Sequence, residues 1–410
     1  MNKIHVSQTM DSYYPNIDGP TNVMTYYSKN INARDDATCN VIVPKAKKSL
    51  KYVDCQPFDV LRCNSLYATK DGYRMGIPFS DPAFKKRLKE EKLDIMHAHS
   101  PFAMGHWTIR EARRRGIPSV ATSHTKFKED FLRTFHGFEP LVWFMMKYIM
   151  YTFNNADSVW TVNDASCQIL RDYGYDGDIT VVRNGTDLKY PQNAEELIDR
   201  VNKAHNLEGQ KNVFIFVGRI AFYKNLNLMA EALKILKKEN DDFKMLIIGD
   251  GFDTAKFKTI ISDLGLSDNV IFVGRISDRE LLQGYYLRSD LFLFPSTYDT
   301  SSLVPIEAAA HKLPVLLIKD SCTAENITDD VNGFLSEETP EAFAKRIKEI
   351  ISDPEKMRKV GEEAHVSVYR TWEMVAEEAF EKYKEIIEKY NDKHSKQKNK
   401  KETKKELLHK

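Results

Sequence analysis

The stretch LFLFPSTYDTSSLVPIEAAAHKLPVLLI, from Leu291 to Ile318, decides the fold class of this chain. Its first four residues, 291–294, form an apolar run that is typical of a buried strand. A polar loop leads to a segment of helical length, 305–311, and a second apolar run, 315–318, ends the stretch. Two strands joined through a helix pair in parallel, so this stretch predicts a βαβ unit of a parallel sheet.

The same alternation continues on both sides of this unit. Two such sets in tandem predict an α/β chain of two doubly wound, Rossmann-like domains with right-handed crossovers. The expected strands are 4–6, 39–43, 95–97, 119–122, 158–162, 180–182, 213–217, 245–248, 270–273, 291–294 and 315–318. The expected helices are 103–115, 164–173, 225–238, 253–264, 278–287, 305–311, 340–352, 354–369 and 372–390.

The polar stretch 188–210 is the best place for a domain boundary. We therefore expect a first domain over residues 1–190, a second over 191–371, and two amphipathic helices after Asp353. The lysine-rich tail 393–410 has almost no apolar residues and is expected to be disordered. Ligands of open α/β sheets bind at the carboxyl ends of the strands, so we expect a site in a central cleft that the two domains face.

Composition limits the class of protein. The chain has 410 residues, of which 42% are hydrophobic and 29% are charged, which is typical of a globular protein. No run reaches the ~18 apolar residues of a membrane span, and the N-terminus lacks a signal-like apolar segment. Five cysteines without a C-x-x-C pair indicate reduced thiols in a cytoplasmic protein.

Charge is balanced in total but unevenly distributed. The formal net charge is +1, yet the first 190 residues are basic, the second domain is acidic, and the tail is rich in lysine. The basic residues are not interleaved with aromatic residues as in nucleic-acid-binding modules, so we expect no nucleic-acid partner. An anionic membrane surface fits the basic first domain and the tail.

Asp299 and Glu307 lie after a predicted strand, in the loop and first helical turn of the opening stretch. The free amides of Ser302, Leu303 and Val304 at the helix start predict a phosphate site. Two carboxylates would repel that anion, so we expect them to accept hydrogen bonds from sugar and ribose hydroxyls. The alternative is structural: Glu307 complements the helix dipole and Asp299 caps a turn.

The segment FIFVGRIAFYKN places Arg219 and Lys224 just after another buried strand. Arginine clamps a pair of oxygens and lysine acts as a point charge, so the two suit a diphosphate leaving group. Surface salt bridging is the alternative interpretation. The turns at 249–251 and 273–276 match neither the G-x-G-x-x-G fingerprint nor a P-loop.

Three strand ends of the first half carry further candidates. Gly19 follows a strand and a loop, where it allows close approach of a ligand to the backbone. His97 and His99 form an H-x-H pair; a metal site is one interpretation, but one inward and one outward side chain is the interpretation we adopt. His124 closes a strand and is a candidate for the cleft, with a hydrogen-bonded structural role as the alternative.

Taken together, these segments resemble the retaining family 4 glycosyltransferases, which have the two-domain GT-B fold. The likeness runs from Asp11 to about Tyr383. The family's E-x7-E signature corresponds to Asp299-x7-Glu307, so its first Glu is replaced by Asp. Its G-R-x4-K element is present over 218–224, and its W-x-x-V-A-E pattern over 372–377, which in the family packs back on the first domain.

The resemblance implies a role for each candidate residue and makes 191–371 the nucleotide-sugar domain and 1–190 the acceptor domain. It implies a metal-independent hexosyltransferase without a cofactor, since the nucleotide sugar is a substrate. The diphosphate would be held by Arg219 and Lys224, together with the amides of Ser302, Leu303 and Val304. Gly19 would also approach the phosphates, and Glu307 would bind the ribose. Arg275 and Ile276 would lie beside the base, and Asp299 and His124 would face the sugar.

The stretches DSYYPNIDGPTNV, HAHSPF and PSTYDTSSLVPIEA look like the branch with bacterial 1,2-diacylglycerol glucosyltransferases. This implies hexose transfer from UDP-glucose or another UDP-hexose to a lipid such as diacylglycerol, on the inner face of the cell membrane. The apolar, aromatic segment 141–153 is either an interfacial helix or an ordinary buried one. The alternatives for function are a polysaccharide or other glycan acceptor, and a catalytically weakened nucleotide-sugar-binding subunit, which the departures at Asp299, Ser302 and Lys312 motivate.

Overall fold

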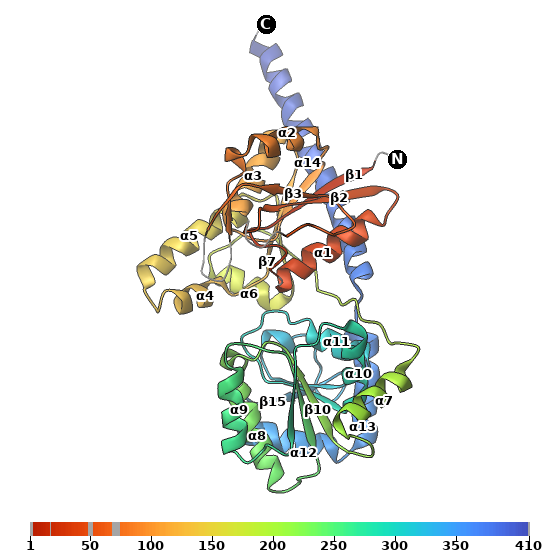
Figure 1. The fold of residues 1–410 in the computed structure, drawn as a ribbon. Helices are drawn as coiled ribbons and strands as arrows, with labels where there is room; N and C mark the ends of the chain where they lie inside the picture. Colours follow the sequence, from red (N-terminus) through yellow and green to blue (C-terminus); the bar gives the residue numbers. More distant parts are fainter. Residues whose placement is uncertain (1–2, 17, 48–51, 68–73, 409–410) are drawn as a thin grey trace. The chain divides into compact units, whose positions relative to one another are not determined.

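The computed structural model describes residues 3–16, 18–47, 52–67 and 74–408, and the chain forms two compact units (Figure 1). Unit 1 contains the chain up to Asn184 and again from Trp372 onward, and unit 2 contains Gly185–Thr371. The division lies a few residues before the expected boundary at 190. The chain returns to unit 1 at the residue where the sequence predicts a returning helix.

The centre of unit 1 is a seven-stranded parallel sheet in the order β3-β2-β1-β6-β7-β8-β9. A short antiparallel pair, β4 and β5, stands apart from it. The strands of unit 1 are β1 (Ile4–Thr9), β2 (Ala37–Pro44), β3 (Val60–Cys63), β4 (Ser65–Tyr67), β5 (Arg74–Gly76), β6 (Ile95–Ala98), β7 (Ser119–Ser123), β8 (Ser158–Thr161) and β9 (Ile179–Val181).

Helices cover both faces of this sheet, as alternate residues of β1 show. The amide of Gln8 hydrogen-bonds Tyr383 of α14, whereas the hydroxyl of the next residue, Thr9, lies 2.6 Å from that of Thr108 in α3. Successive side chains of a strand point to opposite faces, so α14 and α3 lie on opposite sides of the sheet. The helices of unit 1 are α1 (Gly19–Asn32), α2 (Pro82–Glu90), α3 (Ala103–Arg115), α4 (Phe127–Thr134), α5 (Glu139–Asn155), α6 (Asp164–Asp172) and α14 (Trp372–Leu408).

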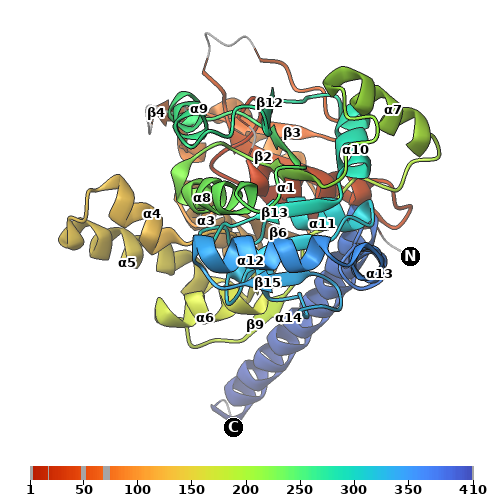
Figure 2. The same ribbon diagram turned by 90° about the horizontal axis from the view of Figure 1, so that it is seen from below.

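Unit 2 is built on a six-stranded parallel sheet in the order β12-β11-β10-β13-β14-β15. Its central strands are apolar throughout and fully buried, as parallel strands covered on both faces must be. Figure 2 shows α8 and α12 side by side along this unit, in agreement with their contacts. The strands are β10 (Val213–Val217), β11 (Lys244–Ile248), β12 (Val270–Gly274), β13 (Leu291–Phe294), β14 (Val315–Ile318) and β15 (Phe334–Ser336). The helices are α7 (Ala194–His205), α8 (Leu226–Lys237), α9 (Thr254–Asp263), α10 (Arg279–Arg288), α11 (Val304–Ala310), α12 (Pro340–Ile351) and α13 (Pro354–Ser367).

Two expectations differ from the structure. The polar stretch 188–210, in which we expected the domain boundary, contains α7, which packs against α10 and buries Leu197 and Val201, and the division between the units precedes it. The tail is not disordered up to its end, because α14 continues to Leu408 (Figure 1). The tail lacks Pro and Gly and is rich in Lys, which favours helix, and a helix that is already formed extends without a new nucleation step.

Candidate active site

The order of the strands in unit 2 locates its ligand-binding edge. From β10 the chain proceeds outward to β11 and β12, and it then returns to β13 on the other side of β10. β10 and β13 therefore flank a topological switch point, where the two following loops diverge and leave a crevice at the carboxyl ends of the strands. The loop after β10 carries Arg219 and Lys224, and the loop after β13 carries Asp299.

Lys224 and Asp299 meet at this switch point. Lys224 ends a 3-10 turn and is only 8% exposed. Its ammonium donates to both carboxylate oxygens of Asp299, at 2.8 and 2.7 Å, and the hydroxyl of Ser296 donates to the same carboxylate at 2.5 Å. Asp299, which occupies the first acidic position of the E-x7-E signature, is thus held by a lysine from the neighbouring loop.

Arg219 is the contrasting cation. It follows Gly218 at the end of β10 and is exposed. Within the described residues it has no ion-pair partner, unlike Lys224. The crevice therefore offers one fixed cation and one that can turn toward an anion.

The loops after β10 and β11 pack backbone against backbone. The amide of Gly218 donates to the carbonyl of Ile248 at 2.9 Å, which extends the strand pairing past the end of β10. A Cβ on Gly249, whose φ is 133°, would lie 1.9 Å from the carbonyl oxygen of Gly218, and one on Gly251 would lie 2.1 Å from that of Ile220. Glycine is required at both positions, and its absence of a side chain fixes the path of the loop that carries Arg219.

Glu307 is held by a second cluster beside the switch point. It lies in the first turn of α11, is 7% exposed, and accepts hydrogen bonds from the Tyr286 hydroxyl at 2.8 Å and the Arg279 guanidinium at 3.1 Å. Arg279 also pairs with Asp187. Burial, together with the Glu307 carboxylate, raises the pKa of Tyr286 well above its usual value, so this hydroxyl remains a hydrogen-bond donor.

The predicted helix start is present, one residue earlier than expected. α11 begins at Val304, and no side chain caps it at Leu303. Ser302, Leu303 and Val304 are half-buried. The backbone amides at this end have no partner within the helix, as a phosphate-facing helix start requires.

Arg275 and Ile276 follow the end of β12, one strand beyond β11. Arg275 is exposed, whereas Ile276 packs against the core of unit 2. Both therefore lie on the same sheet edge as Lys224, two strands away from it. Their predicted role beside the base stays a prediction.

Unit 1 has its own switch point, between β1 and β6. Gly19 is the first residue of α1, which Asp18 caps by accepting from the Thr21 amide at 2.8 Å. A Cβ on Gly19 would meet no protein atom within 4 Å, so the fold itself does not require glycine there. The predicted approach of Gly19 to a ligand stays a prediction.

His124 follows β7 at the same edge of the sheet. It is half-buried, and its Nε2 lies 3.0 Å from Nδ1 of His99. Burial lowers the pKa of His124 to about 4, so the ring is neutral at physiological pH. The expected opposite orientation of His97 and His99 is wrong: both are buried, and their rings stack with centroids 4.1 Å apart, because residues two apart in a strand share a face.

Several residues of these edges were not predicted from the sequence. Asp11, two residues after the end of β1, accepts from the Ser100 hydroxyl at 2.6 Å and the Met104 amide at 2.9 Å, and burial raises its pKa to about 6. Its position after a strand was the available signal. Arg279 and Tyr286 lie within a predicted helix, and only the tertiary contact with Glu307 reveals them.

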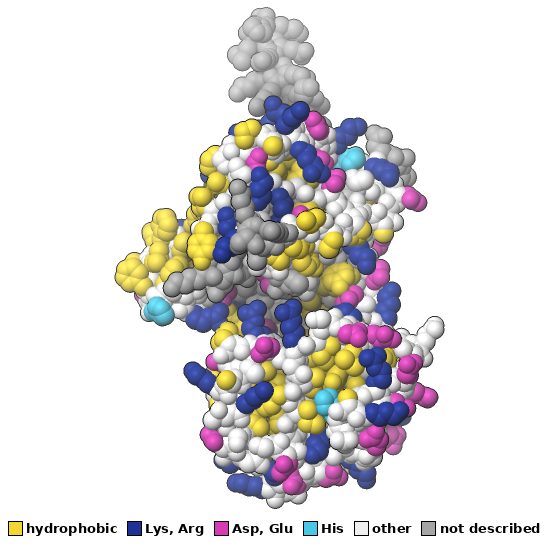
Figure 3. Space-filling view, in the orientation of Figure 1, with side chains coloured by type: hydrophobic (Ala, Val, Ile, Leu, Met, Phe, Trp, Pro, Cys, Tyr) yellow, Lys and Arg dark blue, Asp and Glu magenta, His cyan; other side chains and the backbone are white. Residues whose placement is uncertain are grey.

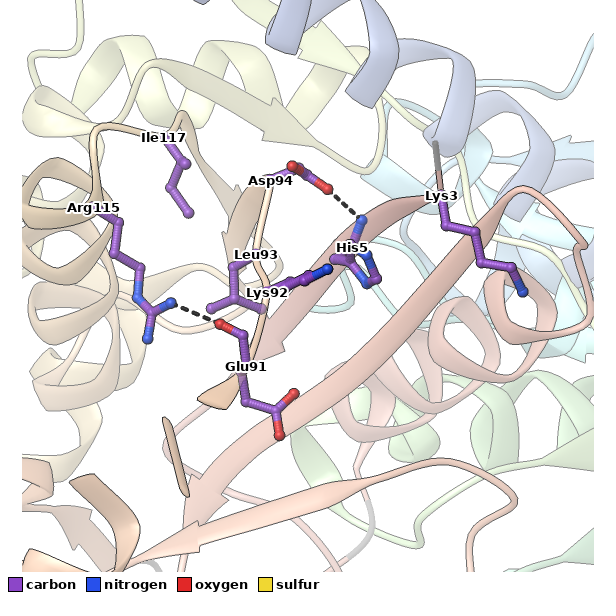
Figure 4. Close-up of a pocket in the computed structure, with 8 residues that line it drawn as sticks. All are labelled: Lys3, His5, Glu91, Lys92, Leu93, Asp94, Arg115 and Ile117. Carbon is purple, nitrogen blue, oxygen red and sulfur yellow. Dashed lines mark hydrogen bonds between the residues drawn. The ribbon is translucent and has the colours of Figure 1, made fainter. Parts of the chain in front are cut away.

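A cavity of about 580 Å³ in unit 1 lies at the opposite edge of its sheet (Figure 4). Its lining includes His5 near the start of β1 and Asp94 just before β6, so it opens at the amino ends of the strands. The His5 amide donates to Asp94, and Arg115 donates to the Glu91 carbonyl at 3.0 Å. None of the candidate site residues lines this cavity, which lies at the edge of the sheet opposite to the switch point of unit 1.

A smaller cavity of about 70 Å³ lies at the carboxyl edge of the same sheet. Asp11 and Tyr13 after β1 line it together with Lys45, Arg62 and Arg74. Arg62 is paired with Asp54 and Lys45 with Asp81, at 2.7 and 2.6 Å, so these two cations of the lining are already neutralised. Within the described residues no three His, Cys, Asp or Glu side chains gather as metal ligands do.

Two family models match consecutive parts of the chain. The model described as Glycosyltransferase Family 4 matches residues 18–190, and the model described as Glycosyl transferases group 1 matches residues 198–366. Together they span most of both units.

Curated relatives and solved structures agree with these models. The chain is 26% identical to alpha-monoglucosyldiacylglycerol synthases of Streptococcus pneumoniae, covering 79% of this chain and 73% of that one, and of Acholeplasma laidlawii, covering 76% and 80%. It is 24% identical to a GDP-mannose-dependent alpha-mannosyltransferase of Corynebacterium glutamicum, over 94% of this chain and 89% of that one. The structure resembles Anabaena HepE in complex with UDP, with a TM-score of 0.73 and 17% identity over 93% of this chain and all of that one. It also resembles sucrose-phosphate synthase of Thermosynechococcus elongatus, with a TM-score of 0.74 and 20% identity over 94% and 99% of the two chains, and these likenesses show the GT-B fold.

Proposed function

The chain belongs to the family 4 glycosyltransferases, and from that premise we propose that it transfers a hexose from a nucleotide-diphosphate sugar to a lipid acceptor at a membrane surface. The donor we propose is UDP-glucose, the acceptor is diacylglycerol, and the anomeric configuration is retained. The names of the glucosyldiacylglycerol synthases among the relatives support this pair of substrates. The UDP in the HepE structure supports a uridine nucleotide.

The observation that carries the proposal is the pairing of Lys224 with Asp299 at the switch point of unit 2, beside the exposed Arg219. Departure of a nucleoside diphosphate develops negative charge on its phosphate oxygens. A fixed ammonium, a guanidinium that can reach the anion, and the uncapped start of α11 would stabilise that charge without reorganisation. No metal ion or cofactor is needed for this part of the proposal.

Glu307 suits the ribose of the donor. A carboxylate offers about four acceptor positions, and Tyr286 and Arg279 occupy two of them. The remaining positions would accept the two ribose hydroxyls. The Arg279 guanidinium also fixes the position of the Glu307 carboxylate.

Asp299 is proposed to orient the transferred sugar, and it is not assigned as a nucleophile. Lys224 and Ser296 hydrogen-bond its carboxylate, which weakens its attack on the anomeric carbon. In the proposed step the bond from the anomeric carbon to the leaving phosphate oxygen breaks and the bond to the acceptor oxygen forms on the same face. The departing phosphate takes the proton of the acceptor hydroxyl.

The lipid acceptor is supported by an exposed aromatic surface on the turn before α5 and the first half of α5, which is yellow at the left of Figure 3. Phe138, Trp143 and Phe144 are each 60% exposed there, and the Lys147 ammonium lies 3.9 Å from the centre of the Trp143 ring. Aromatic rings with adjacent lysines suit the headgroup region of an anionic bilayer. No helix of the described chain combines the length and apolarity needed to cross a bilayer. On the strength of this aromatic surface we propose peripheral attachment at the cytoplasmic face.

One assay tests the proposal. The purified chain is incubated with a panel of UDP- and GDP-sugars, with and without diacylglycerol in anionic vesicles, and released nucleotide and glycolipid are measured. We expect lipid-dependent release of UDP from UDP-glucose and an α-linked glucolipid. Transfer only from GDP-mannose would favour the activity named for the Corynebacterium relative, and transfer only to soluble glycans would replace the lipid acceptor. No turnover of any donor would favour a nucleotide-sugar-binding subunit.

A further inference from the structure

A continuous chain of hydrogen-bonded side chains runs through the core of unit 1 and ends at His124. It starts at Thr122 of β7 and returns to His124, two residues further along the same segment, after passing through β6, α14 and β1. The successive contacts are Thr122 Oγ1 to His97 Nε2 (2.6 Å), His97 Nδ1 to Tyr383 Oη (2.6 Å), Tyr383 Oη to Gln8 Nε2 (3.1 Å), Gln8 Oε1 to His99 Nε2 (2.6 Å) and His99 Nδ1 to His124 Nε2 (3.0 Å).

This chain is excluded from solvent except at its His124 end. Gln8, His97 and Tyr383 are fully buried and His99 is 3% exposed. Apolar rings wall the network; Trp160 stacks on Tyr383 with ring centroids 5.2 Å apart. A buried polar group without a hydrogen bond is costly, so each member of such a network fixes the state of the next.

The orientation of the Gln8 amide determines which atoms of the network carry a proton. Its oxygen faces His99, so His99 Nε2 carries the proton and His99 Nδ1 accepts. The facing atom, Nε2 of His124, must then donate. On the other side the Gln8 amide nitrogen donates to Tyr383, whose hydroxyl donates to His97 Nδ1, and His97 Nε2 donates to Thr122. Burial lowers the pKa of all three histidines, so each ring carries one proton, as this arrangement requires.

We propose that Gln8 and Tyr383 are positioning residues that act through His99 to hold His124 as the neutral Nε2–H tautomer in a fixed ring orientation. In this tautomer Nδ1 is the acceptor of the ring, which suits a hydroxyl group of the transferred hexose. The inference rests on the proposed function, since it assigns the sugar as the partner of His124. Tyr383 is, within the described residues, the only side chain of α14 in the network. Through Tyr383 the inference gives α14 a role in the site.

The test is two-bond ¹⁵N–¹H NMR of the histidine rings in the full-length protein, combined with donor kinetics. We expect His124 to show the pattern of a neutral Nε2–H ring in the unmodified protein. In Tyr383→Phe and Gln8→Met this pattern should change to a mixture of tautomers, and kcat should fall at least fivefold while KM for the donor changes less than twofold. Gln8→Glu keeps an acceptor facing His99, so it should restore the Nε2–H pattern.

The matched control is Tyr285→Phe, which removes a tyrosine–histidine contact of 2.7 Å to His205 in unit 2 and should change neither readout. An Nδ1–H or protonated His124 in the unmodified protein overturns the proposal, and this measurement needs no variant to fold. Unchanged His124 signals in folded Tyr383→Phe also overturn it. The NMR readout does not depend on turnover, so a protein with the expected tautomers but no transferase activity would contradict the proposed function and leave the tautomer assignment intact.

Discussion

Lys224 and Asp299 are 75 positions apart in the chain, and both carboxylate oxygens of Asp299 accept from the Lys224 ammonium. The pair joins the loops that follow the two strands of the switch point, β10 and β13. A diphosphate that binds Lys224 would share it with Asp299. The pair therefore holds the lysine in place before the donor arrives and keeps the aspartate beside the reacting sugar in the proposed step.

Removal of either Lys224 or Arg219 should slow the reaction, but only the loss of Lys224 should also reduce stability. Lys224→Ala should lower turnover at least tenfold, which is ~1.4 kcal/mol or more of barrier, and should also lower the unfolding temperature because it leaves the carboxylate of Asp299 without its cation. Arg219→Ala should lower turnover by a similar factor without a change in stability, since Arg219 is exposed. Kinetics of nucleotide release and thermal unfolding separate the two effects. Unchanged kinetics in a folded double variant would falsify the diphosphate role.

Glu307→Gln should weaken donor binding. The amide keeps the shape of the side chain but loses the charge that faces Arg279, and one of its two terminal atoms no longer accepts hydrogen bonds. We expect KM for the UDP-sugar to rise about tenfold, ~1.4 kcal/mol. Glu280→Gln is the control, because Glu280 is exposed and one residue after Arg279. An equal KM in the Glu307 variant and the control would remove Glu307 from the donor site.

The sequence predicted the parts of the fold that local pattern determines. β10, β13 and β14 have the expected bounds, because each is an uninterrupted apolar run. β3 was not predicted, since Arg62 interrupts its apolar pattern; it pairs with β2, and the Arg62 guanidinium is paired with Asp54. α7 was not predicted, because its surface is mostly polar and only a narrow stripe of it is buried.

For the site, the sequence predicted positions but not partners. Lys224, Asp299 and Glu307 were placed at strand ends because residues after parallel strands share one edge of the sheet. The pairing of Lys224 with Asp299, and that of Glu307 with Tyr286, depends on side chains brought together from different loops and helices. No local pattern contains that information. The buried histidine network was missed because the face assigned to the H-x-H pair was wrong.

Gly249→Ala should unfold unit 2 or destabilise it by at least about 3 kcal/mol. The new Cβ would overlap the Gly218 carbonyl, and the φ of 133° is unfavourable for alanine. Gly19→Ala should leave stability unchanged because no atom occupies the space of its Cβ. If Gly19 approaches the donor phosphates, the same variant should lose activity. Calorimetry and nucleotide release distinguish a role in folding from a role in binding.

Stability should decrease as the pH falls below neutrality. Burial lowers the pKa of His311 to about 4, whereas an unfolded histidine titrates near 6.5. The unfolded state therefore binds the proton first, so the stabilisation is complete above about pH 6.5 and is lost as the pH falls toward 4, by up to about 3 kcal/mol. His124 acts in the same direction in unit 1. Denaturant unfolding at a series of pH values measures the slope, which should be smaller in His311→Gln; an equal slope would exclude His311 as its source.

Replacement of both Trp143 and Phe144 by alanine should weaken vesicle binding at least tenfold. Burial of each ring in a bilayer is worth roughly 1.5–3 kcal/mol, and both are 60% exposed in the chain. Phe252→Ala is the matched control, because this phenylalanine is 72% exposed but belongs to unit 2. Sedimentation with anionic vesicles measures binding, and binding of UDP-glucose without vesicles confirms that the folded site is intact. Equal sedimentation of the double variant and the control would show that the aromatic surface does not contact lipid, and the acceptor would then have to be sought among soluble glycans.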